Sequence, residues 1–141
     1  KKVIGYAREN QEMSGLEDLP IRWICEDASK FVAREVRRGN TYDGIILDPP
    51  KYGRGPKGEV WDIYTSLPSM LADLKQLLDK DALFMILTAY AIRSSFVALH
   101  ELMAETLEIR GGRLESGELV LTTEDGARAL STSLFSRWSS K

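Results

Sequence analysis

The residues best suited to chemistry stand at positions 48–50, where Asp48-Pro49-Pro50 follows the apolar run Gly44–Leu47. Two successive prolines fix φ near about −65° and remove two backbone N–H donors. We therefore expect a stiff elbow that leaves a sheet with its carbonyl oxygens free to accept hydrogen bonds. Together with the carboxylate, these carbonyls would hold the N–H bonds of a target amino group while its lone pair faces an electrophile. The alternative is a strand that the two prolines simply terminate.

A basic, glycine-containing segment follows the elbow directly. It lacks the Gly-Lys-Ser/Thr ending of a phosphate-binding loop, so a nucleotide triphosphatase is disfavoured. A mobile loop with cations and an aromatic ring suits phosphate contact and base stacking. The alternative is a solvated flexible loop without a ligand. The four side chains in question are Lys51, Tyr52, Arg54 and Lys57.

Three other reactive side chains have a structural interpretation. Asp27 precedes a predicted helix, where an Asp N-cap is common and stabilises by about 1 kcal/mol. Cys25 lies in a β-type run and is expected to be buried packing. His100 is the single histidine and lies within a predicted helix, so neither a metal site nor a Ser-His-Asp triad is expected.

Composition indicates one globular core. The chain has 141 residues, of which 43% are hydrophobic, and its formal net charge is −2. No apolar run approaches the roughly 20 residues of a membrane span, and because the sequence opens on Lys1-Lys2 and a helical pattern, no signal peptide is expected. One cysteine excludes an internal disulfide and fits a reducing compartment. We therefore expect a cytoplasmic protein with no membrane partner.

The hydrophobic periodicity predicts helices alternating with strands, which favours a parallel sheet covered by helices. The run Gly44–Leu47 is continuously apolar, as in a strand buried on both faces. Residues 48–59 hold three prolines and three glycines and are expected to be irregular. Helices are predicted over 2–13, 28–38, 61–78 with a break near Pro68, and 94–106; strands over 21–25, 44–47 and 82–88; and a hairpin over 114–123 and 129–138 around Glu124-Asp125-Gly126.

Residues 22–28 (RWICEDA) and 42–55 (YDGIILDPPKYGRG) resemble class I, Rossmann-like, S-adenosylmethionine-dependent methyltransferases. Among these the chain is similar to the bacterial large-subunit ribosomal RNA methyltransferases, and residues 111–138 fit the same group. The resemblance implies a three-layer α/β/α sandwich with a mostly parallel sheet, strand order 3-2-1-4-5-7-6, and a C-terminal antiparallel hairpin.

The resemblance also implies a transferase that uses S-adenosyl-L-methionine and modifies rRNA. By the match of motifs, Asp27 meets the adenine amino group of the cofactor and Ala28 packs nearby. Asp48, Pro49 and Pro50 line the methyl donor and the target atom. RNA-binding is then expected of Lys51, Tyr52, Arg54 and Lys57.

Two features of the family are not found in residues 1–141: the glycine-rich loop after the first strand, and the acidic residue after the second. The chain is therefore expected to be the C-terminal part of one catalytic domain, with the remainder N-terminal in the same protein. Without the first two strands, residues 21–25 lack a partner for their backbone groups. We expect residues 1–141 alone neither to fold independently nor to bind the cofactor well.

The chemistry of the target stays open between several alternatives. Methylation of cytosine at C5 needs a thiolate, and residues 88–92 contain no cysteine, so transfer to nitrogen or oxygen is favoured. A protein or small-molecule methyltransferase is the first alternative, and a non-catalytic fragment of the fold the second. Lys51 replaces the aromatic residue expected after the prolines, and Tyr52 follows one place late. The target nucleotide and the oligomeric state are not defined by the sequence.

Overall fold

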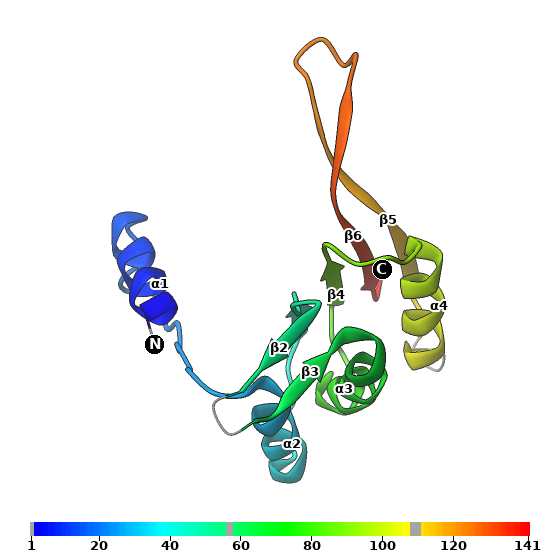
Figure 1. Ribbon diagram of the computed structural model, residues 1–141. Helices are drawn as coiled ribbons and strands as arrows, with labels where there is room; N and C mark the ends of the chain where they lie inside the picture. The colour runs from blue at the N-terminus through cyan, green and yellow to red at the C-terminus, as the bar shows by residue number, and fades with distance from the viewer. Residues whose placement is uncertain (1, 56–57, 108–110) are drawn as a thin grey trace. The chain divides into compact units, whose positions relative to one another are not determined.

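The computed structural model describes residues 2–55, 58–107 and 111–141 (Figure 1). The chain divides into two compact units, Lys1–Phe31 and Val32–Lys141, and each is described here by itself. Lys57 lies outside the described residues, so its predicted contact with a substrate stays a prediction. In the part of the chain that is described, no helix is long and apolar enough to cross a membrane.

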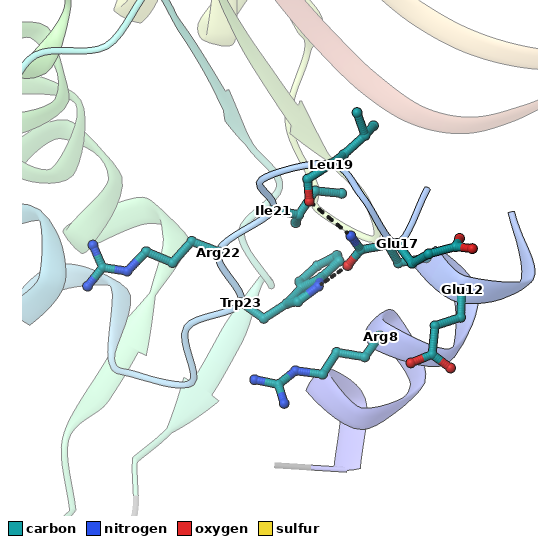
Figure 2. A pocket seen from close by; sticks show the side chains of 8 residues that line it. Arg8, Glu12, Glu17, Leu19, Ile21, Arg22 and Trp23 are labelled. Carbon is teal, nitrogen blue, oxygen red and sulfur yellow. Dashed lines mark hydrogen bonds between the residues drawn. The ribbon is translucent and has the colours of Figure 1, made fainter. Parts of the chain in front are cut away.

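The first unit is built on helix α1 (Lys2–Met13), which has the predicted bounds and ends before Gly15 in the left-handed conformation (φ 64°). The strand predicted over residues 21–25 is wrong, because this segment has no partner in the unit and stays irregular. It is held instead by the Trp23 indole, which donates to Gln11 Oε1 at 2.7 Å (Figure 2). Cys25, expected to be buried, is exposed.

The second unit contains a four-stranded mixed sheet in the order β1-β4-β6-β5. This is the 4-5-7-6 part of the predicted strand order, and it confirms a Rossmann-like fold with a C-terminal antiparallel hairpin. Asp125 and Gly126 (φ 68°) make the hairpin turn as predicted. Strand β1 (Gly44–Leu47) is parallel to β4 (Phe84–Ala89), while β6 (Ala129–Ser139) is antiparallel to both β4 and β5 (Arg113–Thr122).

The two faces of this sheet differ in burial. On one face Met85, Leu87 and Ala89 are fully buried. Helix α4 (Phe96–Leu107) covers the same face, where His100 Nδ1 lies 3.0 Å from Ser116 Oγ, which lies 2.8 Å from the buried Ser136 Oγ. His100 is thus part of the packing.

On the other face of the sheet Ile46 is 69% exposed. Burial of strand β1 on both faces was therefore a wrong expectation for the described residues. The run Gly44–Leu47 is apolar on both faces of the strand, but the helices of this unit cover only one of them.

Helix α2 (Ala28–Arg38) begins where predicted, since Asp27 Oδ1 accepts from the Lys30 N–H at 2.9 Å. Its Glu35 is buried and joins the helix to the chain before β1. The Glu35 carboxylate accepts from Asn40 Nδ2 and from the Tyr42 hydroxyl, both at 2.7 Å, and from Arg38 at 3.2 Å. These hydrogen bonds, Asn40 first, lower the pKa of Glu35 below its ordinary value.

Helix α3 (Ile63–Leu77) runs through Pro68 without the predicted break. It begins later than predicted, because Asp62 is its N-cap and Oδ1 of Asp62 accepts from the Tyr64 N–H at 2.9 Å. A proline inside a helix costs about 3 kcal/mol. Burying an aliphatic side chain contributes about 1.5–3 kcal/mol, so the buried face of α3 outweighs that cost. The buried residues are Ile63, Leu67, Met70, Leu71, Leu74 and Leu77.

Candidate active site

The candidate site lies where β1 and β4 end side by side, at the carboxyl edge of the parallel pair. In this register Leu47 lies beside Leu87, so the next residues, Asp48 and Thr88, are neighbours. Thr88 Oγ1 donates to Asp48 Oδ1 at 2.5 Å. Ligands of open α/β sheets bind at this edge. A charged acceptor is thus held here by a hydroxyl from the neighbouring strand.

Thr88 was not among the site residues predicted from the sequence. The two residues are forty positions apart, and only the pairing of β1 with β4 brings them together. One feature of the sequence could have indicated this contact: an Asp follows one parallel strand, and a hydroxyl residue stands near the end of the next.

The Pro-Pro elbow is present, but its carbonyls are not all free as expected. Pro49 is buried and Pro50 is exposed. The Trp61 indole N–H donates to the Pro50 carbonyl at 2.7 Å, and the Ile63 N–H donates to the Lys51 carbonyl at 3.0 Å. The prediction that the elbow carbonyls are free to accept hydrogen bonds is therefore wrong for Pro50. The Trp61 side chain thus holds the elbow at Pro50, and the Asp48 carboxylate is an acceptor beside it.

The basic segment after the elbow is not irregular, contrary to expectation. Tyr52–Arg54 forms strand β2, which pairs antiparallel with β3 (Val60–Asp62). Three-residue strands without an apolar alternation leave no periodic signal, which explains the error. The Arg54 guanidinium lies over the Tyr52 ring, 5.9 Å from its centroid, and both side chains are exposed. An aromatic face and a cation are therefore presented on an ordered hairpin.

The structure brings the predicted catalytic and substrate residues together only in part. Asp48, Pro49, Pro50, Lys51, Tyr52 and Arg54 follow one another in the second unit. Asp27 and Ala28 belong to the first unit, where Asp27 caps α2 with one carboxylate oxygen. The other oxygen remains chemically suited to accept from an amino group. The roles of these two residues at a cofactor stay predictions.

The first unit carries a hollow of about 410 Å³ between α1 and the irregular segment (Figure 2). Its side chains mix both charges, and they include none of the residues predicted for the site. Among the residues that the structure describes, no group of His, Cys, Asp and Glu could hold a metal ion. The side chains that line the hollow are Arg8, Gln11, Glu12, Glu17, Leu19, Ile21, Arg22 and Trp23.

Comparison with known proteins agrees with this geometry. A solved S-adenosylmethionine-dependent methyltransferase from Agrobacterium tumefaciens is 57% identical over all of this chain and 47% of its own, with a TM-score of 0.94. A structure described as an S-adenosylmethionine-dependent methyltransferase from Streptococcus mutans shares the fold, at 15% identity and a TM-score of 0.65, over 92% of this chain and 34% of its own. No protein-family profile matches.

One curated relative shares a shorter stretch. It is the ribosomal RNA large subunit methyltransferase I of Aeromonas hydrophila, 31% identical over 52 residues, which are 37% of this chain and 13% of the relative. The chain spans about half of the Agrobacterium protein and a smaller part of this relative. The resemblance drawn from the sequence is thus confirmed: the chain has the Rossmann-like fold of S-adenosylmethionine-dependent methyltransferases and a close structural neighbour among them.

Proposed function

We propose that the protein containing this chain is a cytoplasmic S-adenosylmethionine-dependent methyltransferase that modifies a base of ribosomal RNA. The observation that carries the proposal is the Asp48 carboxylate, held by Thr88 at the carboxyl edge of a methyltransferase sheet. The name of the Aeromonas relative supports the choice of rRNA. The exposed Tyr52 and Arg54 on the β2–β3 hairpin supply the stacking and phosphate contacts that RNA requires.

In this proposal the cofactor supplies an electrophilic methyl group, and the chain positions the nucleophile. Asp48 accepts an N–H of the target amine, and Thr88 keeps the carboxylate in place. Bound S-adenosylmethionine would supply the methyl group to the nitrogen lone pair, and the nitrogen would lose its proton to solvent. Asp27 would accept from the adenine amino group of the cofactor beside Ala28. Positioning of this kind needs no strong general base.

Transfer to nitrogen or oxygen is favoured over transfer to a ring carbon. Attack on C6 of cytosine requires a thiolate near the target. The segment after β4 reads Thr88-Ala89-Tyr90-Ala91-Ile92. The single cysteine, Cys25, precedes α2 and does not follow β4.

The proposal includes the extent of the domain. The Agrobacterium protein is about twice as long as this chain. We propose that residues 1–141 are the C-terminal part of one catalytic domain, with the glycine-rich cofactor loop supplied by the preceding part of the same protein.

The test uses the full-length protein with tritium-labelled S-adenosylmethionine, and compares label in RNA with label in protein from a strain that lacks the enzyme. We expect label in ribosomal RNA. Asp48→Ala should abolish it and leave Tm nearly unchanged, because Asp48 is exposed. Asp81→Ala, at another exposed aspartate of the second unit, is the control. Label in the protein fraction would indicate a protein methyltransferase, and label in neither fraction would indicate a small-molecule methyltransferase or a non-catalytic protein.

A further inference from the structure

Strands β4 and β6 separate just beyond the candidate site. Their last residue pair is Ala89 with Leu134, one position after Thr88. Strand β6 stays paired with β5 for four more residue pairs, out to Ala129 with Thr122. In the described chain, no strand therefore lies on the β4 side of β6 at residues 131–133, while β5 stays paired with β6 on the other side. The backbone N–H and C=O groups of that edge have no ladder partner.

A small pocket of about 150 Å³ fills the wedge between the two separating chains. The loop after β4 forms one wall, and its path depends on Ala91, a non-glycine residue in the left-handed conformation (φ 54°). The loop is tied to helix α3, because the Arg93 N–H donates to the Tyr64 hydroxyl at 2.9 Å. The residues lining the pocket are Ala89, Tyr90, Ala91, Ile92, Ser131, Thr132, Ser133 and Leu134.

The residues that line the pocket include an aromatic residue and groups that can donate or accept hydrogen bonds. Tyr90 is half exposed and borders the pocket. Ser131 and Ser133 belong to the opposite wall, at the open edge of β6, whereas the Thr132 hydroxyl donates to the Leu119 carbonyl at 2.9 Å. A flat ligand with alternating donors and acceptors along its rim matches such a wall.

We propose that this pocket receives the heterocycle of the target nucleotide, with Tyr90 stacking on it and the β6 edge reading its rim. The proposal rests on the proposed function and specifies which part of the substrate is held. The place fits, because Thr88, the partner of Asp48, is adjacent in sequence to Ala89 of the pocket wall.

The size of the pocket favours a single base over other occupants. Sites for drug-sized ligands measure about 300–1,000 Å³, so this one holds one flat ring system and no more. A peptide that adds to a sheet needs a longer open edge than residues 131–133 offer, and the loop from Tyr90 to Ile92 forms the facing wall of the pocket.

The test observes binding directly, by methyl NMR of the full-length protein labelled at isoleucine and leucine methyl groups. The probes are the four nucleoside 5′-monophosphates and a capped alanine tripeptide. We expect at least one nucleotide to shift the Ile92 and Leu134 signals, and the tripeptide to shift neither. Tyr90→Ala should weaken that nucleotide about tenfold, since base stacking contributes a factor of this order. Tyr90→Phe keeps the ring and should bind within about twofold of the wild type.

The control variant is Leu130→Ala, at an exposed residue of the same hairpin outside the pocket. It should leave the nucleotide shifts unchanged. Three results would contradict the proposal: signals that shift with the tripeptide but with no nucleotide, signals that none of the probes shifts, or equal nucleotide affinities of the wild type and Tyr90→Ala. Because NMR detects binding without catalytic turnover, its result is independent of the methyl-transfer assay. Nucleotide binding here by a protein that puts no label into RNA would support the pocket and refute the proposed target.

Discussion

Replacing Thr88 by valine tests whether the hydroxyl positions the Asp48 carboxylate. Valine keeps the shape of the side chain and removes the donor of the 2.5 Å hydrogen bond. A hydrogen bond to a charged group contributes about 1.5–3 kcal/mol net. Asp48 is exposed, so water replaces part of the lost interaction. We therefore expect a loss of about 1–1.4 kcal/mol in transition-state stabilisation, which is roughly a five- to tenfold fall in kcat/KM for RNA.

The assay is tritium transfer from S-adenosylmethionine to ribosomal RNA by the full-length protein, with kcat and KM determined separately. Thr88→Ser retains the hydroxyl and is the matched variant, so it should keep most of the wild-type activity. The fall in Thr88→Val should appear in kcat, because the interaction orients the acceptor in the bound complex. Its Tm should change little, since the carboxylate that loses its donor stays hydrated.

Two results would refute the positioning role. Unchanged kcat/KM in Thr88→Val would mean that Asp48 needs no partner. Equal losses in Thr88→Ser and Thr88→Val, accompanied by equal falls in Tm, would mean that the position matters for packing alone.

Two further changes test the scaffold of the full-length protein by urea unfolding. Gly112→Ala should destabilise by about 1–3 kcal/mol, because Gly112 has φ 88° and an added Cβ would clash with the Ser139 carbonyl oxygen; Gly126→Ala, with φ 68° and open space, should cost less, and equal costs would contradict the clash. The pKa of Glu35 is lowered in the fold, so its contribution is complete above about pH 4.3 and is lost as pH falls through the folded pKa. Glu35→Gln should flatten this acid-side fall in stability, and an unchanged pH profile would contradict it.

The elements that carry local signals were predictable from the sequence. Helix α2 has an Asp cap and a helical apolar spacing, and both of its bounds are as expected. The Asp125-Gly126 pair indicated the hairpin because Gly126 readily adopts the left-handed conformation (φ 68°) found in the turn. The Asp48-Pro49-Pro50 elbow was recognisable because its residue types restrict the backbone so strongly.

What was missed depends on contacts between distant parts of the chain. Residues 21–25 have strand-like composition, yet a strand exists only beside a partner. The clamp of Trp61 on the Pro50 carbonyl and the pairing of Thr88 with Asp48 both join different elements. The β2–β3 hairpin is too short for periodicity to reveal it. Local pattern therefore predicted the elements well, and the surroundings of the carboxylate poorly.

The β5–β6 ribbon extends past the end of β4 and is anchored at one end only. Residues can be added or removed there in pairs, one on each strand, without altering the sheet that holds Asp48 and Thr88. Related proteins can therefore change the depth and lining of the pocket by indels in this ribbon alone. Target specificity would then evolve independently of the residues that position the methyl acceptor. Chimeras that exchange residues 118–133 would have the target specificity of the protein that donates the segment.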